Sequence, residues 1–131
     1  MKAVQGFELT EKDLSVVPTG ESATFAARIQ WVYIDRAELR EPLLILTGQR
    51  LIISQQKLFG QRKADFIATW PEVATLSNGP WQGGFNPLIQ LDVQTSRGTV
   101  GLAVQTQYAV AVESAIRAGY LSNPDHPANR H

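Results

Sequence analysis

Apolar and polar residues alternate along most of this chain, and the alternation stops at about residue 104. A period of two is typical of a β-strand with one buried face, and turn residues separate the segments that carry it. We predict about seven strands, at 25–34, 43–46, 51–54, 63–70, 72–76, 89–94 and 100–104. Val32 and Ile34 make the end of the first strand apolar on both faces, so we expect it to bend between two sheets or to be covered twice.

The stretch from Leu43 to Lys63, LLILTGQRLIISQQKLFGQRK, predicts two successive hairpins. Only residues 47–50 separate its first two apolar runs, which is the spacing of a tight β-hairpin. A second turn follows at 58–61, where Gly60 can adopt the positive φ angle that other residues resist. A longer turn, SNGPWQGGFNP, is expected at 77–87 because it is rich in glycine and proline.

The hydrophobic period changes after residue 104. From Thr106, a candidate N-cap, apolar and small residues recur at spacings of three and four, which predicts an amphipathic helix of roughly 13 residues. These residues are Tyr108, Val112, Ala115, Ile116 and Gly119. We expect Gly119 to end the helix, because glycine is common just past the last helical turn.

The two ends of the chain lack the strand pattern. Thr10 and the acids that follow it favour a short helix over 10–17, before a proline. We therefore divide the chain into an N-terminal extension at 1–20, one domain at 21–120 and a tail at 121–131. The tail carries two prolines and no apolar periodicity, so we expect it to be mobile.

Composition narrows the class of protein. The chain has 131 residues, 44% of them hydrophobic and 18% charged, which indicates one globular domain. Twelve basic and twelve acidic residues give zero net charge, which opposes nucleic-acid binding. There is no cysteine, no signal-peptide pattern at the start and no apolar run long enough to span a bilayer. We expect a cytoplasmic protein, with peripheral association to the inner face of the membrane left open.

Two motifs resemble a known family. LLILTGQRLIIS at 43–54 is similar to the strand-turn-strand signature of bacterial PH-like (pleckstrin-homology) and GRAM-like domains, with its Thr-x-x-Arg turn. KLFGQRK at 57–63 resembles the Leu-Phe-Gly turn with basic flanks that often follows. The resemblance covers about 21–120 and implies a β-rich α+β fold. That fold is a partly open barrel of about seven antiparallel strands in two nearly orthogonal sheets, capped by one C-terminal helix.

The resemblance does not select one ligand, since functions in this superfold range from lipid headgroup binding to protein contacts. PH domains that bind phosphoinositides collect Lys and Arg in the turn between their first two strands, because the headgroup needs several cationic donors. Here the corresponding stretch holds three acids and two arginines, which is a poor match: Asp35, Arg36, Glu38, Arg40 and Glu41.

The stretch from 50 to 64 contains basic residues and no acid. Its candidate contacts for an anionic ligand are Arg50, Lys57, Arg62 and Lys63. One interpretation is a basic loop with an apolar tip, Leu58 and Phe59, that touches anionic lipid. We favour the alternative, in which these two side chains fold back over the barrel and the cations only solvate the edge.

Aromatic residues supply the candidate protein contacts, which are Phe59, Trp81 and Phe85. The last two lie among glycines, so a binding loop and a lid over the barrel end are equally consistent with the pattern. Trp31, Tyr33 and Trp70 lie within strand patterns, and we expect them in the core.

No catalytic or metal-binding set can be assembled on the predicted domain. Both histidines, His126 and His131, lie in the tail, and the strand acids show neither carboxylate pairs nor a metal-ligand spacing. We therefore predict a non-enzymatic binding module without a cofactor, whose partner is another protein or a second copy. An anionic membrane surface is the alternative, nucleic acid is the weakest candidate, and no small-molecule substrate is indicated.

Overall fold

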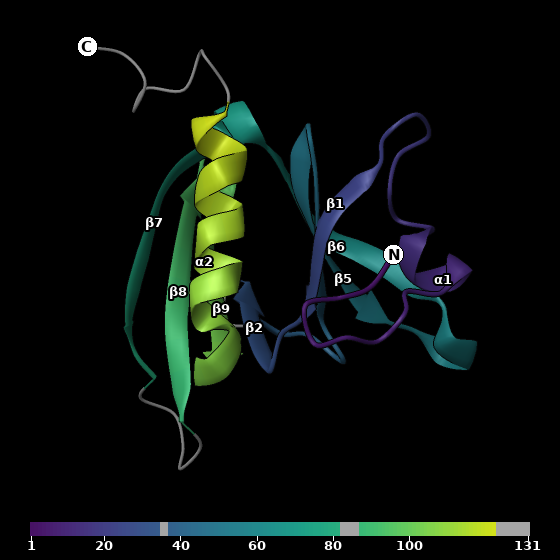
Figure 1. Cartoon of the computed structure of the whole chain (residues 1–131), viewed down its shortest axis with the longest axis horizontal. Coiled ribbons are helices and arrows are strands. Elements are labelled where there is room, and N and C mark those ends of the chain that lie inside the picture. Colours follow the sequence, from purple (N-terminus) through teal and green to yellow (C-terminus); the bar gives the residue numbers. More distant parts are fainter. Residues whose placement is uncertain (35–36, 82–86, 123–131) are drawn as a thin grey trace.

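The computed structural model describes residues 1–34, 37–81 and 87–122. It contains two antiparallel sheets, a long C-terminal helix and a short N-terminal one (Figure 1). The four-stranded sheet has the order β1-β4-β5-β6, and the five-stranded sheet has the order β3-β2-β9-β8-β7. The strands are β1 Ala23–Arg28, β2 Trp31–Ile34, β3 Ala37–Glu38, β4 Leu43–Thr47, β5 Arg50–Gln56, β6 Arg62–Thr69, β7 Val73–Pro80, β8 Leu88–Thr95 and β9 Gly98–Gln105.

The predicted first strand crosses from one sheet to the other. Its first half is β1, which pairs with β4, and its second half is β2, which pairs with β9. The change occurs within two residues, because the Ile29 N–H bonds to the Pro42 carbonyl (3.2 Å) and the Gln30 N–H bonds to the Ala103 carbonyl (3.1 Å). The expected bend is confirmed. This division and the two-residue β3 account for nine strands among the described residues, where the pattern predicted about seven.

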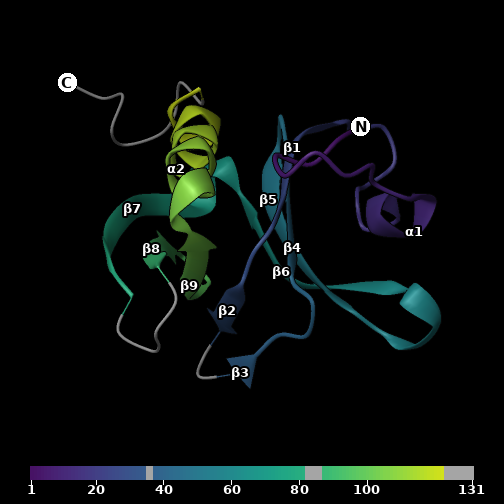
Figure 2. The same ribbon diagram turned by 60° about the horizontal axis from the view of Figure 1, so that its bottom comes forward.

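The main core lies between the two sheets and the inner face of the C-terminal helix α2 (Figure 2). Strand alternation places Leu44 and Leu102 in it, and helical spacing adds Val112 and Ile116, all four with no exposed surface. The arrangement is an open sandwich with a helix across one end, so the predicted β-rich α+β fold is confirmed, without closure into a barrel.

Helix α2 spans Thr106–Leu121 and is longer than predicted. Gly119 lies inside it rather than at its end. The reason is a tertiary contact, since a Cβ atom on Gly119 would fall 2.3 Å from the ring of Trp70. Trp70 belongs to the short 3₁₀ turn η2 (Trp70–Glu72) between the two sheets, so glycine allows the helix to approach that turn.

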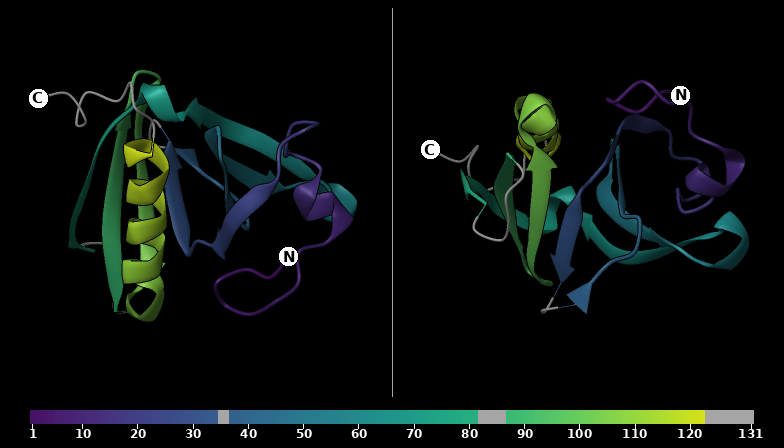
Figure 3. Two further views of the ribbon diagram at one scale, coloured as in Figure 1. Left: turned by 45° about the horizontal axis from the view of Figure 1, so that its top comes forward. Right: turned by 90° about the horizontal axis from the view of Figure 1, so that it is seen from below.

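The N-terminal segment covers the outer face of the four-stranded sheet (Figure 3). Ala3 and Leu9 join Leu43, Ile45 and Ile52 in a second hydrophobic cluster, which leaves β4 buried on both faces. The predicted short helix is present as α1, Glu11–Leu14. Thr10 caps it, because its hydroxyl accepts from the Asp13 N–H (3.1 Å) while the Asp13 carboxylate accepts from the Thr10 N–H (3.0 Å).

The hairpins largely follow the pattern. Gly48 and Gln49 connect β4 to β5, and the 3₁₀ turn η1 (Leu58–Gly60) connects β5 to β6. Gly60 has the expected positive φ of 75°. The prediction for 72–76 was too short, because β7 continues to Pro80 into the stretch expected to be a turn.

Candidate binding surfaces

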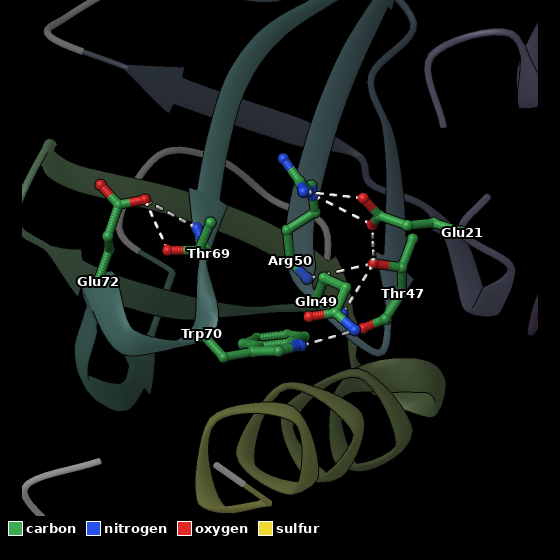
Figure 4. Close-up of polar contacts among 7 residues, drawn as sticks. All are labelled: Glu21, Thr47, Gln49, Arg50, Thr69, Trp70 and Glu72. Carbon is green, nitrogen blue, oxygen red and sulfur yellow. Dashed lines mark hydrogen bonds and ion pairs between the residues drawn. The ribbon is translucent and has the colours of Figure 1, made fainter. Parts of the chain in front are cut away.

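Arg50, the first residue of the predicted basic run, is held in an ion pair at the end of the hairpin between β4 and β5 (Figure 4). Its guanidinium donates to the Glu21 carboxylate, with Nη2 2.8 Å from Oε2 and Nε 3.1 Å from Oε1. The Thr47 hydroxyl donates to the same carboxylate (2.7 Å) and accepts from the Arg50 N–H (3.1 Å). The charge of this guanidinium is therefore compensated within the chain.

The same network continues to the end of β6. The Trp70 indole N–H donates to the Thr47 carbonyl (3.0 Å), and Trp70 is buried, so its predicted place in the core is confirmed. Glu72 accepts from the Thr69 N–H (3.0 Å) and hydroxyl (2.8 Å) and from Arg97 (2.6 Å). These bonds, the Thr69 N–H first, lower the pKa of Glu72 to about 2. The Glu72 carboxylate therefore joins the two sheets, because Thr69 ends β6 in one sheet and Arg97 lies between β8 and β9 in the other.

Arg62 is buried beneath the N-terminal segment, with 3% of its side chain exposed. It pairs with Asp13 (Nε to Oδ1, 3.3 Å) and donates to the carbonyl of Glu41. A groove of about 880 Å³ beside this pair is lined by acids as well as bases. Its charged residues are Glu8, Glu11, Asp13, Glu41, Lys12, Arg28 and Arg62.

The tip of the β5–β6 hairpin points into solvent, which corrects the expectation that it folds back. Leu58 is 75% exposed and Phe59 is 88% exposed, and Lys57 and Lys63 beside them are exposed too. The core between the two sheets is instead covered by α2 and Trp70, away from this tip (Figure 2). The four predicted cations therefore differ: Arg50 and Arg62 are bound internally, whereas Lys57 and Lys63 are exposed, and Lys63 lies 3.9 Å from the Asp65 carboxylate.

The backbone of the tip is fixed. Phe59 has a φ of 61°, a left-handed conformation that a bulky side chain rarely adopts. Its carbonyl accepts from the Lys12 ammonium (2.6 Å), and the Lys57 N–H closes the turn on the Gln61 carbonyl (2.6 Å). Lys12 comes from α1, so the N-terminal segment supports the turn that displays Phe59.

The remaining aromatic residues lie elsewhere. Trp81 stacks on Tyr33, with ring centroids 5.8 Å apart and planes 24° apart. Phe85 lies outside the described residues. Trp31 is 36% exposed and Tyr33 is half-buried, so their predicted place in the core was wrong. Both face away from the core because Val32 between them points inward, and one alternating strand cannot bury both sets.

The described residues 1–34, 37–81 and 87–122 contain no group of three or more His, Cys, Asp or Glu side chains placed to hold a metal ion. Both histidines lie outside these ranges. Over the same ranges, no helix is long and apolar enough to cross a membrane.

Solved structures with the same arrangement include two at low sequence identity. A pleckstrin-homology domain from Shewanella amazonensis SB2B matches with a TM-score of 0.54 at 16% identity, covering 82% of each chain. The C-terminal domain of an unknown protein from Leishmania infantum matches with a TM-score of 0.57 at 18% identity, covering 78% of this chain and 86% of that one. No family model and no curated protein sequence matches. The chain therefore has a PH-like fold.

Sequence reasoning missed the two acids that form ion pairs with arginines of the basic run. Glu21 and Asp13 lie 29 and 49 residues before their partners Arg50 and Arg62. The only local sign was that both lie in a segment without strand pattern, which must pack somewhere on the domain. Their pairing depends on that packing, which no periodicity predicts.

Proposed function

We propose that this chain is a non-catalytic PH-like module that docks on a partner protein through the tip of its β5–β6 hairpin. The observation that carries the proposal is the exposure of Leu58 and Phe59, at 75% and 88%. Adjacent large apolar side chains in water are typical of binding anchors, and aromatic residues dominate the energetics of protein interfaces.

The fixed backbone supports this role. A left-handed Phe costs on the order of 1 kcal/mol or more, and such strain persists where the surrounding structure enforces it. Here Lys12 and the turn closure enforce it. An anchor that is already ordered loses little conformational entropy on binding, so most of the free energy of burying it contributes to affinity.

The charges around the tip favour a protein over an anionic bilayer. Arg50 and Arg62 are neutralised by Glu21 and Asp13, and the neighbouring groove has four acids and three bases. The net charge of the chain is zero. A protein pocket that accepts an apolar knob needs no net charge, whereas peripheral membrane binding by one short loop depends on clustered cations.

The second candidate is an anionic membrane surface, and one observation favours it. Lys57 and Lys63 are exposed next to Leu58 and Phe59, so the tip is amphipathic. Each cation near an anionic surface contributes about 1 kcal/mol, and the two apolar side chains would add burial. The protein would then sit at the inner face of the membrane.

A photo-crosslinking amino acid in place of Phe59 tests the leading proposal in cells. The matched control is the same amino acid in place of Val110, which is 74% exposed on α2. We expect a discrete protein adduct from position 59 only. The identified partner, or the chain itself in sedimentation equilibrium, should bind Phe59→Asp at least about tenfold more weakly than wild type and bind Val110→Asp normally.

The proposal is wrong if both positions give the same adducts, or if Phe59→Asp binds every identified partner like wild type. Liposome sedimentation separates the second candidate. Vesicles with anionic lipid should retain wild type and lose Lys57→Gln/Lys63→Gln if the tip binds membrane, with Lys2→Glu as a control that lowers the net charge by the same two units. Equal retention of all three, or of none, excludes that candidate.

A closer affiliation with bacterial PH-like and GRAM-like domains remains a hypothesis that rests on the motifs at 43–54 and 57–63. An adaptor role for the module would accord with this affiliation, because the functions of the superfold include protein contacts.

A further inference from the structure

One row of side chains crosses the whole five-stranded sheet on the face opposite the core. The strand register pairs Glu38 with Tyr33, Tyr33 with Gly101, Gly101 with Asp92, and Asp92 with Ser77. Cross-strand partners project from the same face of a sheet, so all five lie side by side. They face away from α2, because Val32 and Leu91, which alternate with Tyr33 and Asp92, are buried in the core.

Aromatic rings border this row. Trp81 stacks on Tyr33 from the end of β7, three strands away in the sheet order. Trp31, two residues before Tyr33, projects from the same face and is 36% exposed. Tyr33 and Trp81 are half-buried. The face of an aromatic ring attracts a cation that reaches it.

Gly101 lies between Tyr33 and Asp92 in this row and has no side chain, so its backbone forms the floor of the surface there. A Cβ atom at this position would lie 3.4 Å from Asp92 Oδ1 and 3.9 Å from Tyr33 Cβ. Glycine inside a strand weakens it, and it often marks a place where another group approaches the backbone closely. Asp92 Oδ1 accepts from the Gln90 amide (2.9 Å), which fixes the carboxylate over this floor.

The charge of this face is one-sided. Its described strand residues carry two carboxylates, Glu38 and Asp92, and no lysine or arginine. Among described residues, neither carboxylate is within ion-pair distance of a cation. Arg36 lies outside the described residues. Among the described residues, the cations nearest in sequence are Arg40, two residues past Glu38, and Arg97, which is paired with Glu72 beyond the end of β8. The face is complementary to a positive group.

We infer that this surface binds an arginine side chain of a partner protein. The guanidinium is planar, so it can stack on the Tyr33–Trp81 pair while its N–H groups donate to Asp92 across the Gly101 floor. Arginine fits better than lysine, whose compact ammonium cannot both stack and donate in parallel. The surface lies on the other sheet from Leu58 and Phe59, so it does not depend on the proposed function.

The test uses the peptide acetyl-Gly-Gly-Arg-Gly-Gly-amide, titrated into ¹⁵N-labelled full chain and followed by NMR. The control peptide carries citrulline, which keeps the shape of arginine and lacks its charge. We expect shifts at the indole N–H groups of Trp31 and Trp81 and at the amides of Asp92 and Gly101. Asp92→Asn should weaken binding by about tenfold or more, the loss expected for a hydrogen bond between charged groups.

Controls separate the site from general charge attraction. Glu11→Gln removes one exposed acid far from this face and should bind like wild type. Gly101→Ala fills the floor without changing charge and should weaken binding, while its spectrum shows whether the fold is retained. The inference fails if the citrulline peptide binds equally well, if Asp92→Asn binds like wild type, or if the shifts map to the Glu72 or Glu113 region.

Discussion

The two ends of strand β5 carry the same kind of sequence and have opposite environments. At its start, Arg50 is enclosed with Glu21 and Thr47, and the buried Trp70 completes the cluster. Just after its end, Lys57 and Phe59 project into solvent. Each end combines a cation with an aromatic residue, so residue type does not explain the difference.

The difference comes from what the rest of the chain brings to each end. At the start of β5, the segment before β1 contributes an acid, and α2 packs on Trp70 through Gly119. At the other end, the N-terminal segment contributes Asp13 to Arg62 and Lys12 to the Phe59 carbonyl, both behind the tip. The segment supports the turn without covering it. The comparison teaches that the exposure of a side chain at either end of β5 depends on which other segments of the chain pack there.

Truncating one aromatic residue at each end of β5 should give the largest difference in the free energy of unfolding. Trp70→Ala removes a buried ring and its indole hydrogen bond, and we expect a loss of about 4 kcal/mol in the free energy of unfolding. Phe59→Ala should change it by no more than about 0.5 kcal/mol, because 88% of this residue is already exposed to water. Urea denaturation of both variants measures this, and a loss above 2 kcal/mol for Phe59→Ala would contradict the open tip.

The ion pair between Asp13 and Arg62, which lies behind the tip, can be broken by replacing Asp13. Asp13→Ala leaves the Arg62 guanidinium buried without its carboxylate, and we expect a loss of about 3 kcal/mol. Glu11→Ala, two residues earlier in the same helix and exposed, should cost at most about 0.5 kcal/mol. If the two variants unfold at the same urea concentration, the Asp13–Arg62 pair does not hold the N-terminal segment in place.

The free energy of unfolding should also depend on pH through Glu72, which lies near the enclosed end of β5. Because the pKa of Glu72 is lowered from 4.5 to about 2, its ionised form stabilises the fold above pH 4.5, and this stabilisation is lost as the pH falls toward 2. Glu72→Gln should cost on the order of 2 kcal/mol at pH 7, with the difference from wild type shrinking between pH 4.5 and 2. A pH-independent difference would show that the carboxylate charge is not responsible.

The smallest difference in stability is expected when Arg50 and Lys57, the cations at the two ends of β5, are each replaced. Arg50→Gln breaks a partly buried pair with Glu21 and should cost about 1 kcal/mol. Lys57→Gln should be neutral within about 0.5 kcal/mol, since no described contact of its side chain stabilises the fold. Thermal unfolding of the two variants is the measurement, and equal midpoints would mean that the enclosure of Arg50 has no energetic consequence.

Much of the fold followed from pattern alone. The alternation at 89–94 and 100–104 became the β8–β9 hairpin, and the change of period near residue 104 marked the start of α2. The errors have tertiary causes. The first strand divided because it pairs with β4 and then with β9, and Gly119 extended the helix instead of ending it because Trp70 occupies the space of a Cβ.

The binding surfaces were less predictable. The candidate list contained Phe59 and Trp81, yet exposure of the first and stacking of the second depend on contacts across the chain. The row through Tyr33, Gly101 and Asp92 had no sequence signal, because its members come from three strands and meet only through register. A strand pattern shows which residues share a face, but not which residues lie beside them on the next strand.

The sequence by itself determined most of the strands and the C-terminal helix. It could do so because each depends on local periodicity, which the hydrophobic effect converts into buried faces. Only the tertiary structure decided which cations are neutralised, which aromatic residues stay in water and which acids meet aromatic rings. Those outcomes depend on contacts between residues far apart in the chain, and such contacts form only when the N-terminal segment, the two sheets and the helix have packed together.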